Sequence, residues 1–106
     1  MDRSLFATES ERALAHIEGA IAALDTDEVD PDLAADVLTL EFSDGAEFVI
    51  NAHSAAGQIW MAAGTSAWHF DLDPASKRWV ASRTGEELMA TVARVVGDKL
   101  GRPVEV

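Results

Sequence analysis

The chain has 106 residues and carries 19 acidic against 8 basic side chains, a formal net charge of −11. Cysteine is absent, which excludes a disulfide scaffold, a nucleophilic thiol and a metal cluster held by thiolates. Phosphate contacts depend on Lys and Arg, so the charge balance also argues against a nucleic-acid partner. No apolar run approaches the roughly 20 residues that span a bilayer, and no signal-peptide core opens the chain. We therefore expect one domain over residues 1–106, in the cytoplasm and without membrane binding.

The first expected element is a helix from Ser4 to about Leu24. Its apolar residues recur at helical spacing and form one stripe: Phe6, Ala13, Leu14, Ile17, Ile21 and Leu24. Gly19 interrupts the helix and weakens it by about 1 kcal/mol relative to Ala. Pro31 excludes a continued helix, and a short edge strand is weakly indicated from Asp30 to Ala34.

Alternating apolar and polar residues then predict a run of antiparallel strands. The expected strands cover residues 37–42, 47–52, 58–63, the stretch from Trp68 to Leu72, and residues 78–82. Asp44 and Gly45 form a strong hairpin signal between the first two of these strands. Asp73 and Pro74 mark another turn.

The last expected element is a helix with an apolar face that includes Leu88, Val92 and Leu100. Thr84 and Glu87 have the spacing of a capping box, with Thr84 as the cap. Gly101 and Pro103 end the helix. Two terminal helices around a run of strands predict an α+β fold, a two-layer sandwich in which both helices cover one face of an antiparallel sheet.

Period-2 alternation also predicts which side chains lie on the open face of that sheet. The expected set is Thr39, Glu41, Asn51, Gln58, Trp60 and His69. A Trp flanked by amides on a flat sheet is typical of a protein-interface anchor, although single exposed aromatics are also ordinary. No catalytic motif is present and His69 has no positioned partner, so we do not expect an enzyme.

The negative charge is concentrated in the first half of the chain. Residues 1–53 hold 13 acids and 2 bases, while residues 54–106 hold 6 of each. The densest run is Asp25, Asp27, Glu28, Asp30 and Asp32. An EF-hand is excluded because Asp30 stands where that loop needs glycine. Two interpretations remain: a solvated acidic loop, or carboxylate oxygens that attract hard cations such as iron, Mn²⁺ or Ca²⁺.

Several sequence blocks together resemble the bacterial frataxin (CyaY) family. They are VLTLEFSDG at 37–45, VIN at 49–51, QIWMA at 58–62, WHFD at 68–71, Trp79 and RTGE at 83–86. The order and spacing of these blocks match over nearly the whole chain, and QIWMA is the most diagnostic of them. The Ile17–Glu18 pair fits as well.

The resemblance implies a helix–sheet–helix sandwich that acts in iron–sulfur cluster assembly as a monomeric, non-enzymatic regulator. It implies cysteine desulfurase and the iron–sulfur scaffold protein as partners, contacted through Asn51, Gln58, Trp60 and His69. It also implies weakly bound iron, Fe²⁺ or Fe³⁺, on an acidic ridge. By match and by position the expected ridge residues are Glu18, Asp25, Asp27, Glu28, Asp30 and Asp32. Gly19, Ala22 and Ala23 stand where bacterial members usually carry further acids, so we expect the iron site to shift toward the loop.

Three other hypotheses follow from the same residues. The carboxylate surface also suits an iron store or a metallochaperone that delivers Fe²⁺ to the scaffold. A ferroxidase is disfavoured because the first helix lacks the paired Glu and Glu-x-x-His pattern of di-iron sites. An acidic mimic that occupies nucleic-acid sites would leave the Trp60 face without a role.

Overall fold

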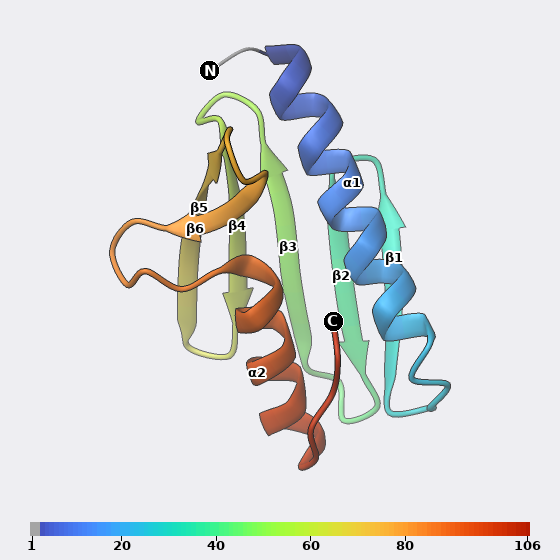
Figure 1. Cartoon of the computed structure of the whole chain (residues 1–106). Helices are drawn as coiled ribbons and strands as arrows, with labels where there is room; N and C mark the ends of the chain where they lie inside the picture. Colours follow the sequence, from blue (N-terminus) through green and yellow to red (C-terminus); the bar gives the residue numbers. More distant parts are fainter. Residues whose placement is uncertain (1–2) are drawn as a thin grey trace.

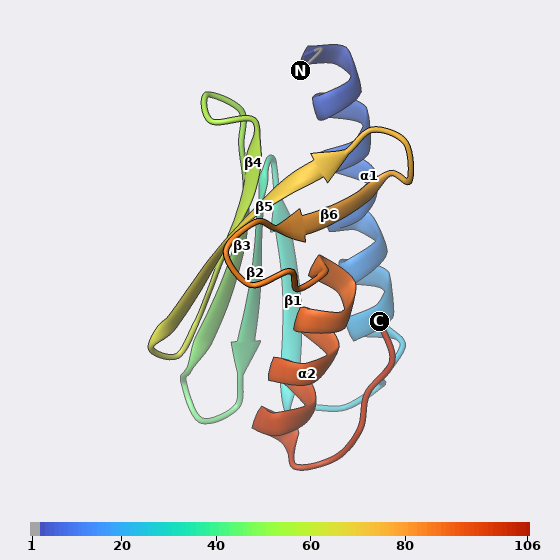
Figure 2. The same ribbon diagram turned by 60° about the vertical axis from the view of Figure 1, so that its left-hand side comes forward.

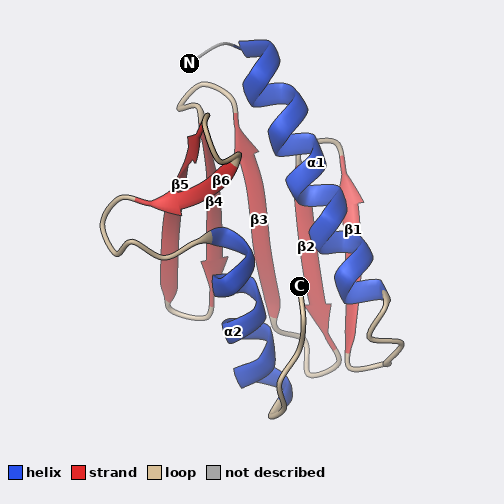
Figure 3. Cartoon of the chain, in the orientation of Figure 1, coloured by secondary structure: helices blue, strands red, loops and turns tan. Residues whose placement is uncertain are grey.

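The computed structural model describes residues 3–106 and has the predicted order of helix, strands and helix (Figures 1 and 3). Its elements are α1 (Arg3–Ala22), β1 (Val29–Ala34), β2 (Val37–Phe42), β3 (Glu47–His53), β4 (Gln58–Ala63), β5 (Ser66–Asp73), β6 (Arg78–Ala81) and α2 (Leu88–Leu100). The weakly indicated edge strand is present as β1. Its Pro31 is tolerated there because β1 has only one neighbouring strand, β2.

The six strands form one antiparallel sheet in which each strand pairs with its sequence neighbour. The β2–β3 hairpin turns at Asp44 and Gly45, as expected. Gly45 has a φ of 91°, which glycine adopts without the clash of a Cβ atom. The Asp44 carboxylate accepts a hydrogen bond of 2.9 Å from the backbone N–H of Ala46 and closes the turn.

Both helices lie on the same side of the sheet, and the other side is open (Figure 2). The strand residues that alternate with the open-face set point toward the helices and are buried at 7% exposure or less: Leu38, Leu40, Phe42, Phe48, Ile50, Ile59, Met61, Phe70 and Leu72. Trp68 has the same alternation but is only partly buried. The chain end after α2 runs back between the two helices (Figure 1), where Val104 and Val106 pack against the core. The expected α+β sandwich is therefore confirmed.

The start of α2 differs from the prediction, because Glu87 caps the helix instead of Thr84. The Glu87 carboxylate accepts hydrogen bonds from the backbone N–H groups of Met89 and Ala90, at 2.9 and 3.1 Å. The backbone before it is still paired with β6, since the carbonyl of Glu86 accepts from the N–H of Ala81. That pairing holds Glu87 extended and delays the helix to Leu88.

Trp68 is half-buried, because its indole N–H reaches a polar partner at the edge of the core. It donates a hydrogen bond of 3.0 Å to the Glu86 carboxylate. Arg94 lies 2.7 Å from the other oxygen of that carboxylate and 5.9 Å from the indole centroid. The Trp68 hydrogen bond, followed by the Arg94 contact, lowers the pKa of Glu86. This contact joins β5 to the connection before α2.

Candidate interaction surface on the open sheet face

The strand register places the sequence-predicted partner residues together on the open side of the sheet. Directly opposite residues of antiparallel neighbours share one face. Asn51 lies opposite Trp60, and Trp60 lies opposite His69. Gln58 pairs with His53 on one side and with Asp71 on the other. Val37 on β2 lies opposite Asn51 and extends the set to that strand. We call this set the indole face: Val37, Asn51, His53, Gln58, Trp60, His69 and Asp71.

Three rings form a stack at the centre of the indole face. The His53 ring lies over one face of the Trp60 ring, with a centroid distance of 3.9 Å and a tilt of 16°. The His69 ring covers the other indole face at 4.4 Å and 14°. Because both faces of the indole are covered, Trp60 presents its edge to solvent. We call these three residues the histidine–indole stack.

Hydrogen bonds fix the orientation of the stack. The Trp60 indole N–H donates to Gln58 Oε1 at 2.8 Å, and Gln58 Nε2 donates to Asp71 Oδ1 at 3.0 Å. The backbone N–H of Ala56 donates to His53 Nδ1 at 3.3 Å, so the neutral His53 ring carries its proton on Nε2. The stack is thus preorganised, and a partner would not have to order it.

A row of acids crosses the same open side at a distance from the stack. Asp30 lies opposite Glu41, and Glu41 lies opposite Glu47, so three exposed carboxylates follow one another on β1, β2 and β3. We call them the acidic row. Glu47 is four residues from Asn51 on the same strand, which corresponds to about 14 Å. Like charges directly opposite destabilise a sheet, and a cationic partner would relieve that repulsion.

The residues predicted to hold iron are spread along the α1–β1 edge. Asp25 and Asp27 are exposed in the loop after α1, Asp30 and Asp32 are exposed on β1, and Glu18 is half-buried on α1. Within residues 3–106, no three His, Asp or Glu side chains are close enough to share a metal ion. Isolated carboxylates fit a hard cation at the surface, but they form no multidentate cage.

Glu28 is the one predicted iron ligand for which the structure gives an ion pair. Its carboxylate lies 2.8 Å from the guanidinium of Arg102 in the chain end after α2. The hydrogen bond from Arg102 lowers the pKa of Glu28, with a smaller contribution from Thr26. A cation at this carboxylate would compete with the Arg102 side chain.

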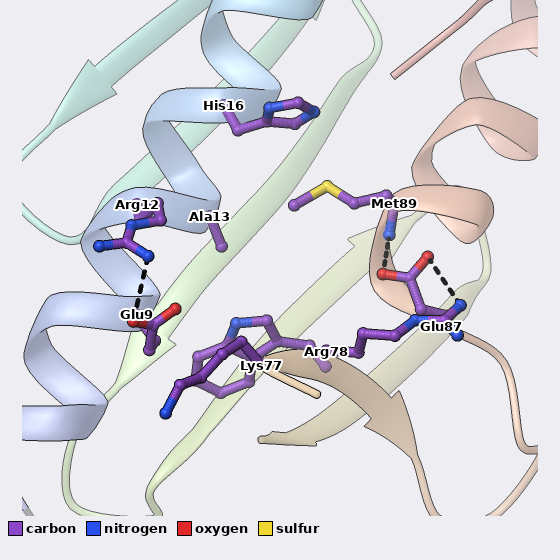
Figure 4. Close-up of a pocket in the computed structure, with 9 residues that line it drawn as sticks. Glu9, Arg12, Ala13, His16, Lys77, Arg78, Glu87 and Met89 are labelled. Carbon is purple, nitrogen blue, oxygen red and sulfur yellow. Dashed lines mark hydrogen bonds and ion pairs between the residues drawn. The ribbon is translucent and has the colours of Figure 1, made fainter. Parts of the chain in front are cut away.

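A groove of about 350 Å³ opens on the other side of the molecule, between α1 and the start of α2 (Figure 4). Charged and polar residues from α1, from the β5–β6 turn and the start of β6, and from the cap of α2 line it: Glu9, Arg12, His16, Lys77, Arg78 and Glu87. Arg12 lies 3.4 Å from Glu9, and Arg78 lies 4.0 Å from Glu87. The lining therefore holds three basic side chains against two acidic ones, and two of the three basic side chains are ion-paired within the groove.

Four members of these surfaces are absent from the sets expected on the open face and on the acidic ridge: Val37, His53, Asp71 and Glu47. Each sits at an outward position of its strand, so alternation could have placed them on the open side. What the sequence does not contain is the register, which brings His53 and Asp71 to Gln58 from opposite sides.

In the described part of the chain, neither helix is long and apolar enough to cross a membrane.

Comparison with known proteins agrees with this geometry. A model of the frataxin-like domain matches residues 1–102. The iron-sulfur cluster assembly protein CyaY of Dechloromonas aromatica is 38% identical over 105 residues, covering 98% of this chain and 97% of that protein. The protein of the same name from Thioalkalivibrio sulfidiphilus is 39% identical over 87 residues, covering 82% and 77%.

A solved structure shows the same fold. The frataxin of Psychromonas ingrahamii superposes with a TM-score of 0.88 at 26% identity, covering 99% of this chain and 97% of its own. The sequence blocks, the sandwich and the family match therefore agree, and the chain belongs to the bacterial frataxin (CyaY) family.

Proposed function

We propose that this protein is an accessory, regulatory component of iron–sulfur cluster assembly that docks on the complex of cysteine desulfurase and scaffold protein. The names of its relatives, iron-sulfur cluster assembly protein CyaY, support the role in cluster assembly. The observation that carries the docking proposal is the histidine–indole stack, a preorganised aromatic group on a sheet side that neither helix covers. The chain has no cysteine to hold a cluster, so cluster assembly takes place on the partner, in the cytoplasm.

Charge defines the kind of partner surface that fits. The acidic row and the exposed Asp25, Asp27 and Asp32 extend from the open side to the α1–β1 edge. A basic patch on the desulfurase complements this surface and speeds the encounter, while the indole face provides the apolar anchor. Exposed charges are screened over about 8–10 Å at physiological ionic strength, so the affinity falls as salt is added.

Calorimetric titration of purified cysteine desulfurase with three variants tests this proposal. Trp60→Ala removes the anchor and is expected to weaken binding about thirtyfold or more. Asp30→Lys reverses a charge in the acidic row and is expected to weaken binding relative to the native protein, more strongly at low salt than at high salt. Asp98→Lys is the matched control, because it makes the same charge change on an exposed residue of α2. Docking through the open side is refuted if Trp60→Ala and Asp98→Lys bind like the native protein.

We also propose that iron binds weakly at the acidic edge, as a regulator or cargo of the assembly complex. The carboxylates of Asp25, Asp27 and Asp32 support this proposal because the structure gives them no ion pair within residues 3–106. Titration with Fe²⁺ is expected to broaden NMR resonances of residues 18–36 first, and Asp25→Asn with Asp27→Asn to reduce that broadening. Equal broadening in the double variant would remove this site.

An iron store or metallochaperone remains the alternative. It requires iron that stays bound through gel filtration and transfers to the scaffold. Rapidly exchanging iron that is lost on the column favours the regulator instead.

A further inference from the structure

We propose that protonation of His53 and His69 acts as a switch that releases the docked partner. This inference rests on the proposed docking function and adds a form of regulation to the same surface. With neutral imidazoles the indole face binds a basic partner, and with protonated imidazoles it repels one.

Protonation of the two imidazoles changes the sign of the charge on the indole face. With both imidazoles neutral, Asp71 is its only ionised group, so the set of seven residues carries −1. Two added protons change that to +1, by −1 + 2. Imidazole is the side chain that changes charge between pH 5 and 8. Protonation of both rings therefore inverts the sign of the charge at the centre of the surface.

The three rings of the histidine–indole stack stay together when the imidazoles are protonated. Each imidazole lies against a face of the Trp60 ring, at 3.9 and 4.4 Å. The face of an indole attracts a cation, so protonation does not push the rings apart. The change reaches a partner as electrostatic repulsion, with the three rings still stacked.

Protonation of His53 also breaks a hydrogen bond to the neighbouring turn. Its Nδ1 accepts the hydrogen bond from the Ala56 backbone N–H. The neutral ring already carries a proton on Nε2, so the incoming proton must go to Nδ1 and end that bond. The turn at residues 54–57, which borders the indole face, then loses its connection to the ring. Protonation is thereby coupled to the shape of the rim as well as to its charge.

Other charged groups surround the two imidazoles. Asp71 lies two residues from His69 on β5 and is linked to the stack through Gln58. Arg83 and Glu86, from the connection after β6, line a groove together with His69. The backbone carbonyl of Asp36, in the β1–β2 turn, accepts a hydrogen bond from the backbone N–H of Ala52, the residue before His53.

The test compares the native protein with a double variant, His53→Phe with His69→Phe, in calorimetric titrations against cysteine desulfurase. Phenyl rings keep the stacking but cannot take up a proton. Repulsion in water between one imidazolium and one partner cation about 6 Å away weakens binding about threefold. The native affinity is therefore expected to fall at least about fivefold between pH 8 and pH 5.5. The double variant measures the remaining pH dependence of the partner.

The outcomes separate this inference from the proposed function. Binding of both proteins at pH 8, with the same affinity ratio between the two pH values, overturns the switch and leaves docking in place. Failure of the native protein to bind at pH 8 overturns both.

A measurement without the partner keeps the switch testable if the phenyl variant does not fold. NMR titration of the native protein is expected to move the Ala56 amide and the Trp60 indole N–H with the same midpoint as the His53 ring protons. An Ala56 amide that stays constant while His53 titrates overturns the coupling to the turn.

Discussion

Replacing Gly19 by Ala tests how much this glycine lowers the stability of α1. Gly19 lies on the exposed side of α1, is not among the glycines with positive φ, and a Cβ atom built there meets nothing within 4 Å. Ala is favoured over Gly inside a helix by about 0.8–1.0 kcal/mol. The free energy of unfolding should rise by about 1 kcal/mol, and the midpoint of thermal unfolding by about 4 °C.

Gly97→Ala is the matched control, because it makes the same change inside α2. A Cβ atom at Gly97 would lie 3.0 Å from the backbone carbonyl oxygen of Arg102, where the chain end folds back. Overpacking of this kind costs about 1–3 kcal/mol and cancels the gain in helix propensity. Both variants are measured by circular dichroism during heating and in urea. Equal stabilisation at the two positions, or destabilisation by Gly19→Ala, refutes the reasoning.

Three further predictions concern the sheet and its edge. Trp68→Phe removes the donor to Glu86 and is expected to lower the free energy of unfolding by about 1–2 kcal/mol in urea; an unchanged urea midpoint would contradict the role of this bond. Glu86 has a lowered pKa, so its contribution is complete above the ordinary value of 4.5 and is lost as the pH falls through the lowered pKa. Glu86→Gln should reduce this loss of stability at acidic pH. If the free energy of unfolding of the variant falls with pH as steeply as that of the native protein, other carboxylates cause the loss. Gly45→Ala places a side chain at a φ of 91° and should cost about 1–2 kcal/mol, measured in the same way.

Most of the fold follows from local patterns in the sequence. Alternation predicts the strands because successive side chains point to opposite faces, and the apolar stripe predicts α1. The start of α2 could not be read in this way. Thr84 and Glu87 match a capping pattern, but the backbone hydrogen bond between Ala81 and Glu86 is a tertiary pairing that keeps the segment extended. A pairing across the fold therefore decides where the helix begins.

The candidate surface was only partly predictable, for a related reason. Alternation places Trp60 and His69 on the open side but says nothing of which strands are neighbours. The register adds His53 to the other face of the indole and links Gln58 to Asp71. The predicted acids lie at the expected edge, yet Glu28 is paired with a chain end far away in the sequence.

The central claim is that the open side of the sheet, with Trp60 at its centre, is where a partner docks. The most direct measurement is an NMR map of the isotope-labelled protein on addition of the desulfurase–scaffold complex. Resonances of Asn51, Trp60 and His69 should shift or broaden first, while those of α2 stay unchanged. Perturbations confined to the helical side, around the groove between α1 and α2, would contradict the account.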